Sequence, residues 1–74
     1  MKAFYSFLMK YRQPKDIDEL TSFANRAYED HGFPKQSKSY DEVSRYLEMN
    51  GHYLDSMSIF DQAWEIYQED EKGL

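Results

Sequence analysis

The 74-residue chain contains no cysteine, only three glycines, two prolines and two histidines. The lack of cysteine excludes a disulfide scaffold and a thiolate zinc site, and it fits a reducing compartment. The sequence has no glycine-rich phosphate-binding loop, no nucleophile–base signature, and no apolar run long enough to cross a bilayer. We therefore expect a cytoplasmic protein that is not an enzyme and that has no cofactor, no metal and no membrane partner.

Aromatic side chains are abundant instead, with five Phe, seven Tyr and one Trp. A chain of this length makes one domain, residues 1–74, and buries only about 60–65% of its unfolded surface. Each aromatic ring can bury ~150–250 Å², which is worth roughly 4–6 kcal/mol before ordering entropy is subtracted. An aromatic core can therefore hold this fold without a disulfide or a metal.

Apolar residues at helical spacing predict a helix over residues 2–12 that ends before Pro14. A second helix is expected from Asp16, with Glu19 completing a capping box, to a left-handed turn at Gly32. The apolar stripe of the first helix contains Phe4, Phe7, Leu8 and Tyr11. The inward-facing residues of the second are Ile17, Leu20, Ala24, Ala27 and Tyr28.

A third helix is predicted to open at Ser39 with a capping box that Glu42 completes, and to end at Gly51, again in a left-handed turn. A fourth helix should begin near Asp55 or Ser56 and fray in the acidic run at residues 69–71. The buried edge expected for the third helix is Tyr40, Val43 and Leu47. The core stripe expected for the fourth is Met57, Phe60, Ala63, Trp64 and Tyr67.

Charge is unevenly distributed along a chain whose net charge is −5. The first 15 residues carry only basic charges, at Lys2, Lys10, Arg12 and Lys15. The fourth helix carries an acidic row at Asp61, Glu65 and Glu69, and such a row is weakly destabilising by itself. The basic face can complement this row either within one chain or between two copies.

A protein–protein interaction module is therefore the leading hypothesis, with head-to-tail self-association as its mechanism. The partner is then either a second copy of the chain or an unknown protein. The alternative is a nucleic-acid-associated protein that uses the basic N-terminal helix. That alternative is disfavoured, because four positive charges make a weak phosphate site and the acidic helix repels phosphates.

The segment from Tyr28 to Pro34 places two carboxylates and an imidazole together, at Glu29, Asp30 and His31. Neighbouring side chains on a helix diverge by about 100°, so at most two of the three can reach one ion. We interpret His31 as a residue at the negative helix end, and we expect Arg26 to pair with Glu29 or Asp30. The loop that follows, at Phe33, Pro34 and Lys35, is expected to be exposed.

Several motifs together resemble the YozE family, a group of short, uncharacterised proteins from low-GC Gram-positive bacteria. The resemblance covers essentially the whole chain. It implies an all-α, SAM-like fold of four helices, arranged as two roughly orthogonal helical hairpins, and it implies no activity. The most specific part is the run with Tyr28, Glu29, Asp30, His31, Phe33 and Pro34, followed at a distance by Trp64.

Overall fold

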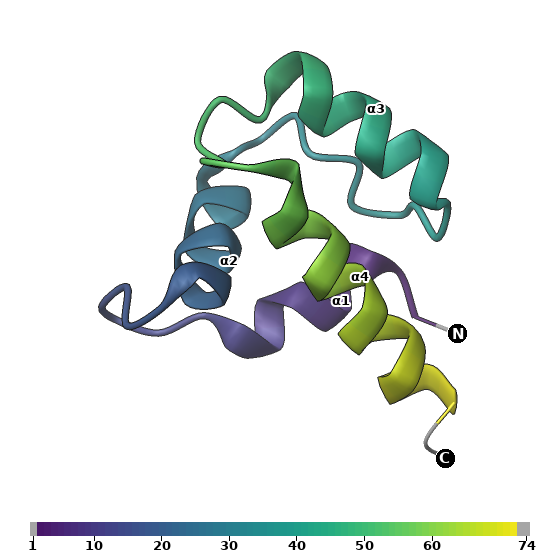
Figure 1. The fold of residues 1–74 in the computed structure, drawn as a ribbon, viewed down its shortest axis with the longest axis horizontal. Coiled ribbons are helices and arrows are strands. Elements are labelled where there is room, and N and C mark those ends of the chain that lie inside the picture. Colours follow the sequence, from purple (N-terminus) through teal and green to yellow (C-terminus); the bar gives the residue numbers. More distant parts are fainter. Residues whose placement is uncertain (1, 73–74) are drawn as a thin grey trace.

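The computed structural model describes residues 2–72, and all regular secondary structure in that range is helical, without β-strands. Figure 1 shows α2 standing beside the other helices, with α3 along one side of α4 and α1 behind α4. No helix within residues 2–72 is both long and apolar enough to cross a membrane. The predicted all-α, four-helix fold is confirmed. The elements are α1 (Phe4–Leu8), the 3₁₀ helix η1 (Met9–Tyr11), α2 (Glu19–Glu29), α3 (Tyr40–Asn50) and α4 (Met57–Lys72).

The first helix is shorter than predicted, because it begins at Phe4 and its last turn is the 3₁₀ helix η1. Ala3 provides no side-chain cap, and the backbone N–H of Phe4 instead donates to the carbonyl of Ser37 at 3.1 Å. Arg12 has an extended backbone, with φ −66° and ψ 137°. The helical geometry therefore ends at Tyr11, three residues before Pro14.

The start of α2 also differs from the prediction, since its N-cap is Asp18 and not Asp16. The Asp18 carboxylate accepts from the backbone N–H of Thr21 at 2.8 Å, and the Thr21 hydroxyl accepts from the backbone N–H of Asp18 at 3.0 Å. Threonine thus supplies the reciprocal half of the capping box that was assigned to Glu19. The shift leaves Ile17 outside the helix and 71% exposed, so its predicted burial is wrong.

Neither helix-ending glycine adopts the predicted left-handed conformation, because no residue between 2 and 72 has a positive φ. Gly51 has φ −90° and ψ 45°, and its N–H donates to the carbonyl of Leu47 at 2.8 Å. A Cβ at this position would lie 2.7 Å from the same carbonyl oxygen. Glycine is therefore needed at position 51 because the backbone approaches closely, and not because of its φ value, which any residue can adopt.

The predicted starts of α3 and α4 agree with the structure to within two residues. Ser39 caps α3 by accepting from the backbone N–H of Glu42 at 3.2 Å. The predicted capping box is not completed, because the Ser39 N–H donates to the Ser37 hydroxyl at 3.1 Å and not to Glu42. Ser56 accepts from the backbone N–H of Ser58 at 3.1 Å ahead of the first turn of α4. Tyr40 was predicted to be buried but is 41% exposed. Its ring packs against Trp64, while its hydroxyl donates to the exposed carboxylate of Asp61 on α4.

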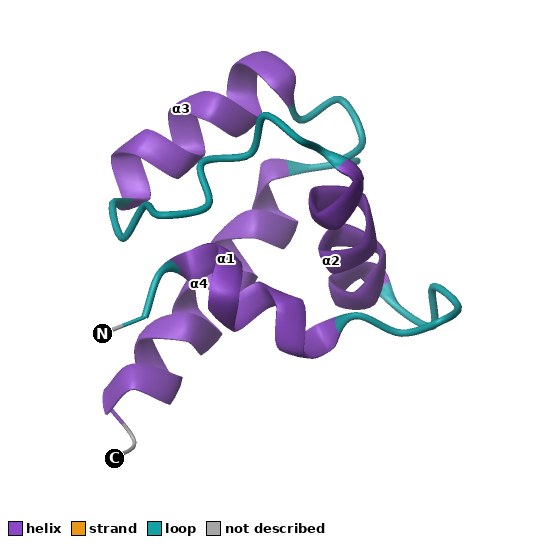
Figure 2. Ribbon diagram, turned by 180° about the vertical axis from the view of Figure 1, so that it is seen from behind, coloured by secondary structure: helices purple, strands orange, loops and turns teal. Residues whose placement is uncertain are grey.

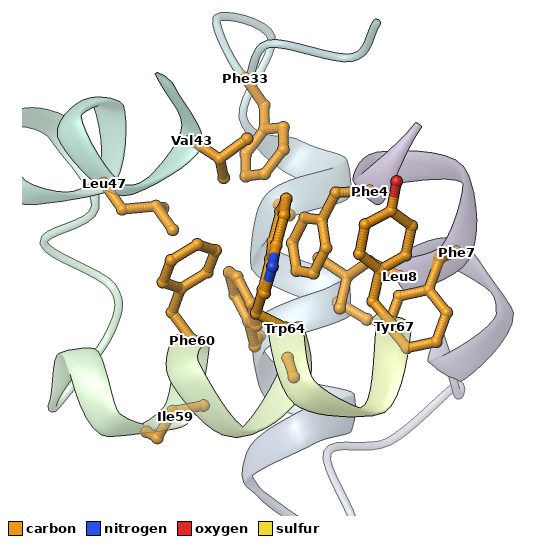
Figure 3. Packing of buried hydrophobic residues seen from close by; sticks show 14 residues of the cluster. Phe4, Phe7, Leu8, Phe33, Val43, Leu47, Ile59, Phe60, Trp64 and Tyr67 are labelled. Carbon is orange, nitrogen blue, oxygen red and sulfur yellow. The ribbon is translucent and has the colours of Figure 1, made fainter. Parts of the chain in front are cut away.

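The core is a cluster of aromatic rings centred on Phe4, which is completely buried (Figure 3). The Phe4 ring lies 5.1 Å from Trp64 and 5.5 Å from Phe60, measured between centroids. The predicted burial of the α4 aromatic stripe is confirmed. Phe33 is also buried, at 3% exposure, so the expectation that its loop is exposed is wrong for this residue. Its ring packs between Tyr5 and Tyr46, which explains why an apolar ring stands in a polar loop.

Candidate functional site

A hollow lies between α2 and the loop that precedes it, and we call it the α2 hollow. Its volume is about 410 Å³ and it is open to solvent. In Figure 2 this loop, which joins α1 and η1 to α2, projects away from the rest of the protein. The α2 hollow is lined by Arg12, Gln13, Pro14, Lys15, Asp16, Asn25, Arg26 and Glu29.

Hydrogen bonds from two α2 side chains hold the loop in place. The Asn25 amide nitrogen donates to the carbonyl of Gln13 at 3.0 Å and to the carboxylate of Asp16 at 2.7 Å. Arg26 donates to the other oxygen of the same carboxylate at 3.0 Å. These bonds, first from Asn25 and then from Arg26, hold the pKa of Asp16 below its ordinary value. The wall of the hollow is therefore a fixed arrangement, with Asn25 almost fully buried.

The charges of the α2 hollow are only partly neutralised inside it. Arg26 contacts two carboxylates, Asp16 at 3.0 Å and Glu29 at 3.0 Å, and these are the acidic residues of the lining. Arg12 and Lys15 form no ion pair with any residue in the range 2–72. The guanidinium of Arg12 instead lies 3.6 Å from the centre of the Tyr28 ring. Three cations against two carboxylates leave an excess of positive charge on a chain that is acidic overall.

A second hollow of about 300 Å³ lies where the end of α2 meets the loop between α3 and α4. It is lined by Arg26, Glu29, Asp30, His52 and Tyr53. Arg26 and Glu29 line both hollows, so their ion pair separates the two.

Asp30 is the centre of a hydrogen-bond network beside this second hollow, which we call the Asp30 network. Its carboxylate accepts from the Tyr46 hydroxyl at 2.7 and 2.8 Å, from the Tyr53 hydroxyl at 3.0 Å, and from the backbone N–H of Gly32 at 3.1 Å. These bonds connect the end of α2 to α3 and to the loop before α4. The expected ion pair of Asp30 with Arg26 is absent from the described residues, and Arg26 pairs with Glu29, the other residue named in that prediction.

The Asp30 network lowers the pKa of its carboxyl group and raises the pKa values of its two tyrosines. Burial raises the pKa of Asp30, but the hydrogen bonds from Tyr46, Tyr53 and Gly32 outweigh it, and the pKa lies below its usual value. Burial, and then the hydrogen bond to Asp30, raise the pKa of Tyr46 to about 12. The same causes, in the same order, raise the pKa of Tyr53. At neutral pH the network therefore holds one carboxylate and two neutral phenols.

The other residues of the Tyr28–Pro34 segment have different surroundings. Tyr28 is 51% exposed beneath Arg12, so its predicted burial is wrong. His31 is exposed, and its carbonyl accepts from the Lys35 ammonium at 3.2 Å. No three His, Asp or Glu side chains within residues 2–72 are close enough together to bind a metal ion. Within the segment, Glu29 thus lines the α2 hollow, Asp30 is the centre of the Asp30 network, and Phe33 belongs to the core.

The four N-terminal basic residues do not form a single face. Lys10 forms an ion pair with Asp70 at 2.8 Å, and the backbone N–H of Lys2 donates to Glu71 at 3.0 Å. The hydrogen bond between Lys10 and Asp70 raises the pKa of Lys10 and lowers that of Asp70. The charge of Lys10 is thus held at the end of α4, whereas Arg12 and Lys15 line the α2 hollow.

The predicted acidic row is present on the outer side of α4. Asp61 accepts a hydrogen bond from the Tyr40 hydroxyl at 2.7 Å. Glu65 and Glu69 are exposed and form no ion pair with a residue of the described chain 2–72. The acids that contact the N-terminal region are therefore Asp70 and Glu71, and not the members of this row.

Sequence reasoning missed the contacts between residues distant in sequence that build the two hollows. Asn25, Asp16 and Arg26 meet across nine or ten positions of sequence, a separation that no helical or capping pattern marks. Tyr53 lies 23 positions from Asp30. The available signal was chemical, because a partly buried tyrosine hydroxyl needs an acceptor and carboxylates are strong ones.

This architecture defines a small all-α domain of the SAM-like class. Residues 3–69 match the model of the family described as YozE SAM-like fold, and the chain belongs to that family. It is 61% identical to a UPF0346 protein of Bacillus licheniformis, over 97% of this chain and 99% of that protein. It is 55% identical to a UPF0346 protein of Listeria innocua, over 96% of this chain and 92% of that protein.

A solved structure in the same family supports the fold. The solution NMR structure of the UPF0346 protein YozE from Bacillus subtilis superposes on this chain with a TM-score of 0.87. The two sequences are 53% identical, and the match covers 99% of this chain and 89% of the other. The resemblance to the YozE family and its SAM-like fold is thereby confirmed, and the names of these relatives state no activity.

Proposed function

We propose that this protein is a non-enzymatic, cytoplasmic interaction module that binds an acidic segment of a protein partner in the α2 hollow. The observation that carries the proposal is the pair Arg12 and Lys15, which line a hollow and have no carboxylate partner within residues 2–72. The two carboxylates of the same lining already bind Arg26. An incoming carboxylate therefore meets unpaired cations.

The stacking of Arg12 on Tyr28 supports recognition of a carboxylate. A guanidinium that lies on an aromatic ring uses one face for that contact, while its N–H donors lie in its plane and point outward. These donors can bind a carboxylate with two parallel hydrogen bonds. The ring also restricts the side chain before binding, which lowers the ordering cost of the contact. Lys15 adds a second, more flexible cation to the lining of the hollow.

The non-enzymatic part of the proposal is supported by the directions of the pKa shifts. General acids and bases work best with a pKa near the operating pH. The shifted carboxyl groups of Asp16, Asp30 and Asp70 all move downward, whereas all of the shifted tyrosines move upward. These shifts move the pKa of each group further from pH 7, so they favour fixed charges and hydrogen bonds over proton transfer.

A protein segment fits the α2 hollow better than a nucleic acid does. Asp16 and Glu29 lie in the same lining and repel a continuous row of phosphates, whereas they can accept N–H donors from a peptide backbone. Lys10, one of the four cations on which the nucleic-acid hypothesis relied, is already paired with Asp70. Affinity for nucleic acid grows with the number of phosphates neutralised, and two unpaired cations neutralise few.

Fluorescence anisotropy with a labelled glutamate-rich peptide tests the proposal in low-salt buffer. We expect saturable binding that weakens about tenfold or more in the double variant Arg12→Ala with Lys15→Ala. The matched control is Lys38→Ala with Arg45→Ala, which removes two exposed cations outside the hollow. Equal losses in both variants, or no binding by the parent, would overturn the proposal. Tighter binding of a labelled oligonucleotide than of the peptide would favour the nucleic-acid alternative instead.

A further inference from the structure

We infer that the acidic segment bound by the α2 hollow is the outer row of α4 from a second copy of this chain, so that copies associate head to tail. The inference rests on the proposed function of the α2 hollow. Its own evidence is the pair Glu65 and Glu69, which lie four positions apart, are exposed, and form no ion pair within residues 2–72.

The two unpaired carboxylates of the row equal in number the two unpaired cations of the α2 hollow. Residues four apart on a helix lie about 5–6 Å from each other between their Cβ atoms, on the same face. Arg12 and Lys15 present two unpaired cations in one hollow. Like charges four apart destabilise a helix slightly, and an opposite charge supplied by a partner removes that cost. Each surface thus supplies the charges that the other lacks.

A copy cannot satisfy its own α2 hollow with its own α4. The end of α4 is held at the N-terminal region by the Lys10–Asp70 ion pair and by the bond from the Lys2 N–H to Glu71. Trp64 and Tyr67 fix the same helix in the core. In Figure 1, whose longest axis is horizontal, the loop before α2 lies at the left and the end of α4 at the lower right. The contact must therefore form between molecules.

Two different surfaces on one molecule generate a heterologous contact. After two copies meet, one α2 hollow and one acidic row are still free, so further copies can add. The predicted product is an open series of oligomers, whose average size rises with concentration. Because the contact is electrostatic and exposed, it should weaken as the Debye length falls from ~30 Å at 0.01 M salt to ~8 Å at 0.15 M.

A charge-swap experiment by sedimentation velocity tests the contact in low salt. Variant A carries Arg12→Glu with Lys15→Glu, and variant B carries Glu65→Lys with Glu69→Lys. Each variant alone has like charges on both surfaces, so we expect each to stay monomeric at concentrations where the parent associates. An equimolar mixture restores complementary contacts between A and B, and we expect association to return. Persistent monomers in the mixture, or in the parent, would overturn head-to-tail association.

Matched controls separate a specific contact from an effect of net charge. Lys38→Glu with Arg45→Glu changes the net charge by the same amount as variant A, at exposed residues outside the hollow. Glu42→Lys with Glu48→Lys does the same for variant B, on α3. Both controls should still associate with themselves, and loss of association in either would contradict the proposed surfaces.

The peptide assay distinguishes this inference from the proposed function. Peptide binding by a parent that stays monomeric would overturn self-association and leave the acidic-segment site intact. Loss of peptide binding in variant A together with retained self-association would overturn the assignment of self-association to the α2 hollow and leave the acidic-segment site intact. Far-UV circular dichroism of each variant shows that it is folded before either comparison is made.

Discussion

The Asp30→Ala substitution should destabilise this protein far more than the partial exposure of Asp30 suggests. The carboxylate accepts from Tyr46, Tyr53 and the backbone of Gly32, at 2.7 to 3.1 Å. Hydrogen bonds to a charged group contribute about 1.5–3 kcal/mol each, and their removal leaves two partly buried phenols without an acceptor. We expect a loss of about 3–5 kcal/mol from a total stability of about 4–11 kcal/mol for a domain of this size.

Urea unfolding followed by far-UV circular dichroism measures this loss. Tyr46→Phe and Tyr53→Phe each remove one hydroxyl and should cost about 1–2 kcal/mol, because the carboxylate keeps its other donors. His31→Ala changes an exposed neighbour and should alter stability by no more than about 0.5 kcal/mol. A loss for Asp30→Ala below about 1 kcal/mol, or equal to that of His31→Ala, would refute the role assigned to the network.

The same network predicts how stability changes with pH. The pKa of Asp30 is lower in the folded protein than in the unfolded chain, so its contribution is present above about pH 4 and disappears as the pH falls through the folded value. The pKa of Tyr46 rises from 10 to about 12, so its contribution is present below pH 10 and is lost as the pH rises towards 12. Tyr46→Phe should therefore reduce the alkaline loss of stability.

Two further substitutions test the core and the end of α3. Trp64→Ala should cost roughly 3–5 kcal/mol and leave much of the chain unfolded, because the indole packs on Phe4 in the core; a thermal melt within a few degrees of the parent would contradict this. Gly51→Ala should cost about 1–3 kcal/mol in urea unfolding, because its Cβ would lie 2.7 Å from a backbone oxygen; a cost as small as that of the exposed Glu48→Ala would contradict it.

The sequence predicted the helices and most of the core because both depend on local periodicity. The α4 stripe with Phe60, Trp64 and Tyr67 repeats every three or four residues, and all three side chains are buried. Ile17 and Tyr28 fit the apolar pattern of α2 as well, yet both are exposed. Ile17 precedes Asp18, the N-cap of α2, and Tyr28 lies at the edge of the buried face, where Arg12 covers it.

The helix ends were predicted less well because several residues compete for each capping role. Asp16 and Asp18 both have a carboxylate suited to an N-cap. Asp18 takes that role because Thr21 lies three positions on and returns the bond, which frees Asp16 to bind Asn25 and Arg26. That second contact depends on the tertiary position of the loop, and sequence spacing contains no information about it.

The most distinctive segment of the sequence proves to be largely structural, and this changes where a binding function should be sought. Asp30 ties three parts of the chain together, and Phe33 fills the space between Tyr5 and Tyr46. Residues whose hydrogen bonds and surfaces are satisfied within the fold have little left to offer a partner. Arg12 and Lys15 form no ion pair within residues 2–72, so their charges remain available to a partner. A binding function is therefore better sought at these two unpaired cations than in the segment that identifies the family.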